Sequence, residues 1–311
     1  MSPFINNIVE KQGALQFPTA FVWISLLVFV LAWHSVFAVE LPPDWQRTEW
    51  TPIFHGIDSA TGQAETPGLM RVYAMRIDRK ADGITFFSTP RATEGFEFNV
   101  KETIRETVPQ FLEKHHLQVA FNANFYGPLN AATQKSPGPS VLRGLAVSQG
   151  QIVSKNQKSR PVFLVFKDNR VEIAKGQAED VLPPVDVETA VAGNLILVDQ
   201  GVVVPRADQA AHPRTAVGIC KDSRYVYFIV IDGRQPGYSI GATSTETGQW
   251  LVLFGAWNGI NLDGGGSTTM VIGSNDGKAK VLNIPCGQSN VPNTYRYNGN
   301  NIGIRAKSLA P

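Results

Sequence analysis

The chain has 311 residues, of which 43% are hydrophobic and only 17% are charged. This composition is that of a globular protein with a sizeable buried core, in one large domain or two small ones. The formal net charge of +2 is close to neutral, and the Lys and Arg residues are scattered along the chain. The sequence therefore gives no support for binding of nucleic acid or another polyanion.

The amino-terminal part is almost uninterrupted apolar sequence over residues 21–39. Its apolar core at residues 20–32 has the length of a signal-peptide core, and Val36 and Ala38 are small residues where signal peptidase requires them. We expect an export signal at residues 1–38 and a mature domain at residues 39–311. An uncleaved membrane anchor is the alternative, because the region before the apolar core is long. In both cases the domain lies outside the cytoplasm, in the periplasm or secreted.

Short β-strands dominate the predicted secondary structure. Residues 72–77 and 84–87 are predicted to form a hairpin, and the apolar run 119–126 to form a strand. Further short strands are expected at residues 144–153, 161–166, 171–174, 195–198 and 202–204.

Two segments are predicted to be helical. Residues 100–115 carry apolar side chains at helical spacing, with a kink or break expected at Pro109. Thr243, followed three residues later by Glu246, predicts a capping box that begins a buried helix. We expect a single α+β domain with mixed, largely antiparallel β-sheets flanked by a few helices.

The two cysteines leave two alternatives open. In an exported protein, a bridge between Cys220 and Cys286 would close a long loop and contribute about 4 kcal/mol in the chain-entropy model. Cys220 also follows a short apolar run, as a buried free thiol in a strand would. No group of cysteines and histidines has the spacing of a zinc site.

The most informative segment is the glycine-rich turn within residues 261–270, at Asp263. Three glycines and two hydroxyl side chains follow this carboxylate directly: Gly264, Gly265, Gly266, Ser267 and Thr268. Successive glycines allow positive φ angles and a close approach, so that several backbone N–H groups can converge on phosphate or sugar oxygens. A turn in which the aspartate caps its own backbone is the alternative. A predicted strand at residues 269–272 follows, which favours an ordered binding loop.

Three arginines lie in short segments that also carry Asp, Asn, Gly or His residues. Asp232 and Arg234 follow the apolar run 225–231, while Arg214 precedes a strand and Arg296 precedes the last one. Guanidinium groups bind phosphate with two parallel hydrogen bonds and stay charged, so these arginines together could neutralise a phosphodiester. An ion pair in a surface turn is the alternative for Asp232 and Arg234. The sequence lacks the Gly-x-Ser-x-Gly elbow of a serine hydrolase.

Four of these segments, in the same order, resemble the phosphodiester glycosidase family: residues 120–125, 214–218, 232–235 and 261–270. The resemblance extends from about residue 100 to residue 304. It implies a hydrolase that cleaves the glycosidic C–O bond between the anomeric carbon of a sugar and a phosphodiester oxygen. Bacterial members of the family are often exported and linked by name to exopolysaccharide.

The resemblance also implies roles for single residues. Asp263 is expected to act as base or nucleophile, and Asp232 to orient Arg234 or water. The expected substrate-binding residues are Asn122, Asn124, Arg214, Thr215, Arg234, Ser239, Gly264, Gly265, Gly266, Ser267, Thr268, Arg296 and Asn300. Among them, the two asparagines are expected to hold sugar hydroxyls, and the arginines to hold phosphate.

The expected partner is a sugar phosphodiester or glycan, without nucleic acid, and with a membrane only through the amino-terminal segment. No cofactor is required, although a divalent metal at the two aspartates is conceivable because hard cations bind carboxylates near phosphate. Two other functions stay open. One is a non-catalytic envelope protein that binds phosphoglycan or exopolysaccharide, and the other is a phosphodiesterase that cleaves the P–O bond.

Overall fold

A computed structural model describes residues 44–309, except 131, 208, 209 and 275. These residues belong to one compact unit, Leu41–Pro311. The predicted export signal at residues 1–38 lies outside the described residues. Among the residues that are described, no helix is both long enough and apolar enough to cross a membrane.

The largest sheet has nine strands. They are β1 (Gln46–Arg47), β2 (Thr51–Phe54), β3 (Ile57–Ala64), β4 (Met70–Asp78), β15 (Leu195–Asp199), β16 (Val202–Val203), β17 (Arg214–Ile219), β18 (Tyr225–Ile231) and β19 (Asn258–Asn261). Their order is β1-β3-β4-β18-β17-β19-β15-β16, and β2 pairs with β3. Strand β18 is buried on both faces because its residues are all β-branched or aromatic.

Two five-stranded sheets and a small sheet complete the β-structure. The first contains β21 (Ala279–Val281), β20 (Met270–Gly273), β7 (Val119–Asn122), β22 (Asn301–Arg305) and β5 (Thr85–Ser88), in that order. The second contains β11 (Gln151–Ser154), β10 (Ala146–Ser148), β14 (Val187–Ala192), β12 (Val162–Phe166) and β13 (Val171–Ala174). The small sheet contains β6 (Thr103–Ile104), β9 (Pro139–Leu142) and β8 (Tyr126–Gly127).

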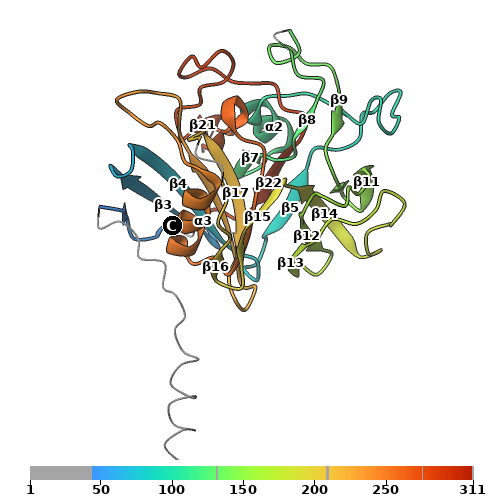
Figure 1. Ribbon diagram of the computed structural model, residues 1–311. Helices are drawn as coiled ribbons and strands as arrows, with labels where there is room; N and C mark the ends of the chain where they lie inside the picture. Colours follow the sequence, from blue (N-terminus) through green and yellow to red (C-terminus); the bar gives the residue numbers. More distant parts are fainter. Residues whose placement is uncertain (1–43, 131, 208–209, 275, 310–311) are drawn as a thin grey trace, which may run out of the picture. The chain divides into compact units, whose positions relative to one another are not determined.

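The described residues form two α-helices, each of which covers one sheet (Figure 1). Helix α2 (Val108–His115) packs on β7 and β20, and α3 (Ser244–Phe254) packs on the nine-stranded sheet. The capping box predicted for α3 is confirmed: Thr243 Oγ1 accepts from the Glu246 N–H at 3.2 Å, and Glu246 accepts from the Thr243 N–H at 2.7 Å.

Three aromatic rings connect the three larger sheets. Phe121 of β7 stacks on Phe228 of β18 with ring centroids 4.4 Å apart, and Phe163 of β12 meets Phe228 edge-on at 6.0 Å. All three side chains are fully buried, so each contributes a large apolar area to the core. This contact places the end of β7 beside β17 and β18, where the candidate site lies.

The fold is richer in β-structure than the expected α+β class. Every pairing between the named strands is antiparallel, so the expectation of mixed sheets is wrong for the described residues. The predicted hairpin of residues 72–77 and 84–87 is also wrong. Both edges of β4 are occupied, by β3 and β18, and β5 instead pairs with β22 in another sheet.

The predicted helix at residues 100–115 begins later than expected, at Val108. Proline suits the first turn of a helix, where its missing N–H needs no partner, so Pro109 marks the start of α2 rather than a kink. Residues 103–104 form β6 instead. Of the two alternatives for the cysteines, the disulfide is not formed: Cys220 is a half-buried free thiol directly after β17, and Cys286 is a buried free thiol.

Candidate active site

The glycine-rich turn forms a short 3-10 helix (η1, Gly265–Ser267) between β19 and β20. Most of its N–H groups are bonded within the protein: Gly264 N–H donates to Asp263 Oδ1 at 3.0 Å, and Gly265 N–H to the Pro213 carbonyl at 2.8 Å. Ser267 and Thr268 donate to carbonyls of the same turn. Four of the N–H groups expected to converge on an anion are therefore already bonded within the protein.

Asn122, at the end of β7, holds this turn in place. Its Nδ2 donates to the Asp263 carbonyl at 2.5 Å, and its Oδ1 accepts from Thr215 Oγ1 at 2.8 Å and from the Thr269 N–H at 3.2 Å. The side chain is completely buried. These bonds join β7, β17 and the turn, so Asn122 and Thr215 hold the backbone at Asp263, and their expected contact with a substrate stays a prediction.

The carboxylate of Asp263 is the least satisfied acidic group of the site. The residue is 6% exposed, its Oδ1 accepts the Gly264 N–H, and its Oδ2 is buried without a hydrogen-bond partner among the described residues. Burial raises the pKa of Asp263 to about 6, against the opposing effects of a hydrogen bond from the Ser267 side chain and of the Arg296 and Arg160 charges. This group can therefore exchange a proton near neutral pH and still has lone pairs available.

Arg296 lies on one side of the turn. Its Nη1 donates to Ser267 Oγ at 3.4 Å, and its charge lowers the pKa of Asp263. A Cβ atom added to Gly266 would stand 2.5 Å from Arg296 Nη2 and 1.6 Å from the Gly287 carbonyl oxygen. Only glycine at position 266 allows this close approach.

Arg234 lies against the same turn. A Cβ atom added to Gly265 would stand 3.1 Å from Arg234 Nη2, and Arg234 Nη1 donates to Asn290 Oδ1 at 3.2 Å. Arg234 itself has a φ of 59°, so it reaches this place from a left-handed backbone that non-glycine residues adopt only rarely. The structure thus brings two of the three predicted arginines, 234 and 296, to the glycine turn.

The third arginine, Arg214, does not point its guanidinium to the turn. Its Nε donates to the Ala242 carbonyl at 2.8 Å and its Nη2 to the Ala210 carbonyl at 3.4 Å. The backbone of Arg214 passes Gly264, where an added Cβ would stand 3.6 Å from the Arg214 Cα. These two hydrogen bonds tie Arg214 to the segment before α3 and to Ala210, and its expected phosphate contact stays a prediction.

Asp232, directly after β18, differs from Asp263 in its partners. Its Oδ1 accepts from Asn283 Nδ2 at 2.8 Å, and its Oδ2 accepts from the Ile284 N–H at 2.9 Å and from the Tyr238 hydroxyl at 3.1 Å. Burial raises its pKa to about 6 as well, and the residue is 1% exposed. Both oxygens of Asp232 thus accept hydrogen bonds that support the loop at Asn283, and its expected role in orienting Arg234 or water stays a prediction.

Three further predicted residues are buried and bonded within the protein. Asn124 Oδ1 accepts from Asn300 Nδ2 at 2.8 Å and from the Ala192 N–H at 3.1 Å, and Ser239 Oγ donates to the Asp232 carbonyl at 2.6 Å. Asn124 is 1% exposed and Asn300 and Ser239 are 0% exposed. Their side chains hold strands and loops together, and the expected contacts of these three residues with a substrate stay predictions.

Three residues of the site were missed by the sequence interpretation. Arg160 acts on Asp263 through its charge, and Tyr126, whose pKa is raised by burial, is close enough to feel the charges of Asp263 and Arg296. Cys286 Sγ lies 3.8 Å from the Gly265 carbonyl oxygen. Tyr126 follows the Asn124 segment directly and could have been included, whereas nothing in the sequence near Arg160 indicates its role.

The two aspartates do not form a metal site with their neighbours. Among the described residues, no group of three or more His, Cys, Asp or Glu side chains is arranged to hold a metal ion. The oxygens of Asp232 already accept three hydrogen bonds, and Asp263 alone is too small a ligand set for a hard cation. The donor set does not fit the divalent metal considered from the sequence.

Comparison with known proteins supports the sequence resemblance. The sequence profile of the phosphodiester glycosidase family matches residues 115–305, more than half of the chain. No curated protein matches this chain.

Solved structures share the fold at low sequence identity. A hypothetical protein from Synechocystis has a TM-score of 0.59 at 16% identity over 86% of this chain and 64% of that chain, so this chain spans less than two thirds of that protein. The zebrafish N-acetylglucosamine-1-phosphodiester alpha-N-acetylglucosaminidase catalytic domain, auto-inhibited by its pro-peptide, has a TM-score of 0.58 at 17% identity over 86% and 85% of the two chains. A protein from Burkholderia pseudomallei described as exported has a TM-score of 0.54 at 14% identity over 76% and 74%. The resemblance predicted from the sequence motifs is thus confirmed, and the chain belongs to the phosphodiester glycosidase family.

Proposed function

We propose that this protein hydrolyses the glycosidic C–O bond of a sugar 1-phosphodiester, with Asp263 as the reacting carboxylate. The observation that carries the proposal is the Asp263 Oδ2 atom, which is buried, has no hydrogen-bond partner among the described residues and belongs to a group with a pKa raised to about 6. A buried, unpartnered carboxylate oxygen costs folding free energy, so its retention points to a function in chemistry.

The proposed reaction needs one carboxylate and a place for negative charge. Asp263 takes a proton from water as the water oxygen bonds to the anomeric carbon, or it bonds to that carbon first and water then releases the sugar. In both routes the C–O bond breaks and its electron pair leaves with the phosphate. A phosphomonoester is a good leaving group, so the reaction depends little on a general acid.

Arg296 and Arg234 are the proposed phosphate ligands. Their guanidinium groups both lie against the glycine turn, Arg296 at Gly266 and Arg234 at Gly265. Guanidinium groups stay protonated and stabilise the charge that develops on the departing phosphate. Asp263 lies at the start of this turn, which supports a common role for the carboxylate and the two cations.

The substrate class and the location of the protein are further parts of the proposal. We infer an exported, periplasmic or secreted enzyme that acts on a glycan or envelope polymer. The inference rests on the apolar segment at residues 20–32, on the family and on the carbohydrate chemistry of its named zebrafish relative. The domain at residues 39–311 would be the mature enzyme.

The test is hydrolysis of a panel of sugar 1-phosphodiesters in water enriched in heavy oxygen, with mass analysis of the phosphomonoester product. Cleavage of the C–O bond leaves this product unlabelled, whereas cleavage of the P–O bond adds one heavy oxygen to it. The phosphomonoester is the better readout because a free anomeric hydroxyl exchanges oxygen with water. A labelled phosphomonoester, or binding of the panel without any turnover, would contradict the proposal.

A further inference from the structure

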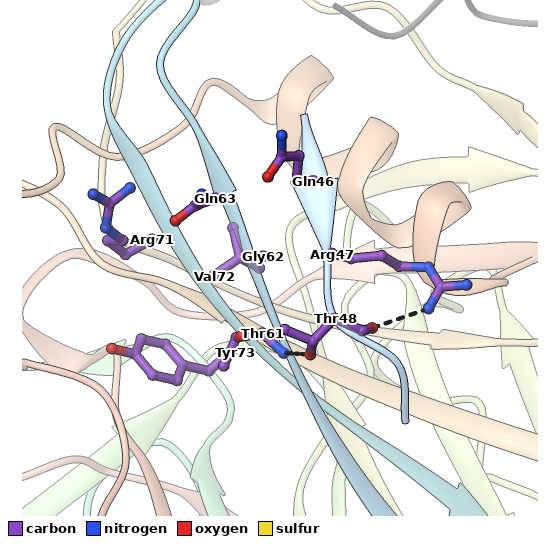
Figure 2. Close-up of a pocket in the computed structure, with 9 residues that line it drawn as sticks. All are labelled: Gln46, Arg47, Thr48, Thr61, Gly62, Gln63, Arg71, Val72 and Tyr73. Atoms are coloured by element: carbon purple, nitrogen blue, oxygen red, sulfur yellow. Dashed lines mark hydrogen bonds between the residues drawn. The ribbon is translucent and has the colours of Figure 1, made fainter. Parts of the chain in front are cut away.

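A pocket lies near the β1 edge of the nine-stranded sheet (Figure 2). Its volume of about 370 Å³ is within the range of about 300–1,000 Å³ that is typical of small-molecule sites. Its walls come from residues 46–48, 61–63 and 71–73. All of them precede the segment at residues 115–305 that matches the family profile, so this pocket is not part of the matched region.

Strand register places three polar side chains in one row across the pocket. Gln46 of β1 pairs with Gln63 of β3, and Gln63 pairs with Arg71 of β4. Residues directly opposite each other in antiparallel strands point to the same face, and Tyr73, two residues further along β4, shares this face. Figure 2 shows the row, with Arg47 pointing to the other side of β1.

Arg71 is held in position by the protein. Its N–H donates to Ser239 Oγ at 3.1 Å, and its carbonyl accepts from the Asp232 N–H at 3.0 Å. Its guanidinium donates to the Met70 carbonyl at 3.2 Å and lies 6.0 Å from the centre of the Tyr238 ring. A cation fixed in this way loses little conformational freedom when a ligand binds.

Tyr73 is fixed as well. Its hydroxyl is 3.0 Å from the Tyr238 hydroxyl, which in turn donates to Asp232. The aromatic ring therefore has a defined orientation on the same face as Arg71 and Gln63. Aromatic rings with a fixed orientation offer an apolar surface to one side of a sugar ring.

The chemistry of this face matches an acidic sugar. No Asp or Glu is among the residues that line the pocket. A guanidinium binds a carboxylate or a phosphate with paired hydrogen bonds, and each side-chain amide offers both donors and an acceptor to neighbouring hydroxyls. We propose that the pocket at Gln46, Gln63, Arg71 and Tyr73 binds an acidic saccharide unit, a sugar that carries a carboxylate or a phosphate. The proposal does not depend on the chemistry at Asp263.

The test is calorimetric titration of the full chain at low salt with four probes: glucuronate, glucose 6-phosphate, glucose and inorganic phosphate. Binding of one or both acidic sugars is expected, tighter than that of glucose and of inorganic phosphate. Arg71→Gln should weaken this binding at least about tenfold, since a hydrogen bond to a charged group contributes about 1.5–3 kcal/mol. Gln63→Ala, at an exposed side chain that leaves the fold intact, should weaken it a few-fold.

Two further variants locate the binding. Arg170→Gln, at an exposed arginine of the β12–β13 turn, is the matched control and should leave the affinity unchanged. Arg224→Gln, at an exposed arginine of the turn between β17 and β18, is a second control outside both sites and should also leave it unchanged. Glucuronate binding alone identifies a carboxylate ligand and glucose 6-phosphate binding alone a phosphate ligand, and either supports the proposal. Equal affinities in wild type and in both pocket variants would overturn it, as would inorganic phosphate binding as tightly as the acidic sugars.

Discussion

Asp263 and Asp232 are alike in most respects that a sequence or a pKa can reveal. Each comes within two residues of the end of a strand in the nine-stranded sheet, each is buried, and in each case burial raises the pKa to about 6. They differ in their partners. Asp232 accepts hydrogen bonds on both oxygens, whereas Asp263 Oδ2 has no partner among the described residues.

This difference shows that a raised pKa alone does not identify a reacting group. The Asp232 carboxylate already accepts three hydrogen bonds of the about four that a carboxylate can accept, whereas Asp263 Oδ2 accepts none from the described residues. Structural networks raise pKa values through the same burial as active sites do. From these hydrogen-bond partners we infer that Asp263 is the reacting carboxylate and that Asp232 stabilises the structure.

The largest expected effect is that of Asp263→Asn. The amide cannot take a proton from water or bond to the anomeric carbon, so kcat/KM on a sugar 1-phosphodiester should fall by about 100- to 10,000-fold. The Gly264 N–H can still donate to the amide oxygen, so the fold should be kept, which circular dichroism and thermal unfolding would check. Activity near that of wild type would show that Asp263 is not the reacting carboxylate. The two aspartates would then not differ in the way proposed.

Arg296→Gln should have the next largest effect. Removal of one charged group that stabilises the developing phosphate charge costs about 100-fold or more in kcat. Arg214→Gln is the matched variant, because the Arg214 guanidinium donates to carbonyls beside α3 instead of lying at the glycine turn. Measured side by side, Arg296→Gln should lose more kcat per folded molecule, and the reverse order would contradict the assignment of the phosphate ligands.

The pH dependence should follow the ionisation of Asp263. A base or nucleophile must be deprotonated, and with a pKa of about 6 the group is protonated below that pH. The value of kcat/KM should therefore rise with pH, level off above about pH 6, and fall about tenfold for each pH unit on the acid side. Rate measurements from pH 4 to pH 8 would check this. A profile that is flat across pH 6 would show that Asp263 does not act in its ionised form.

Local signals in the sequence predicted the elements next to the site well. The capping pair Thr243 and Glu246 set the start of α3, and apolar runs set β18 and β20, because caps and runs act over a few residues. The partners of each strand were harder to predict from the sequence. The pairing of β4 with β18 joins residues more than a hundred positions apart, and no local pattern predicts it.

The same reason limits what the sequence could say of the site. Asp263 was identified from its glycines, and Arg296 from its segment, since both lie in recognisable motifs. The hydrogen bonds of Asn122 and Asn124 within the protein were not predicted, because they depend on partners distant in the sequence, such as Thr215 and Ala192. A sequence motif predicts where a polar residue lies, but it does not predict whether the side chain already forms its hydrogen bonds within the protein.

The smallest expected effect on catalysis is that of Asp232→Ala. This change leaves three donors, from Tyr238, Asn283 and Ile284, without their acceptor, so the free energy of unfolding should fall by roughly 1–3 kcal/mol. Because Asp232 is not expected to take part in the reaction, kcat per folded molecule should fall by less than about tenfold. Loss of a general base would lower it by about 100-fold or more. Urea unfolding measures the first quantity, and initial rates divided by the folded fraction measure the second.

Asp232→Asn is the milder control for the same site. It retains one acceptor oxygen, and the Tyr238 hydroxyl can turn to accept from the new amide, so it should lose less stability than the alanine variant. A loss of kcat in Asp232→Asn as large as that in Asp263→Asn, with stability unchanged, would make Asp232 a reacting group and reverse the comparison. The expected result is that stability decreases from wild type to Asp232→Asn to Asp232→Ala, while kcat per folded molecule stays within tenfold of wild type. This result would support a structural role for Asp232 and a reacting role for Asp263.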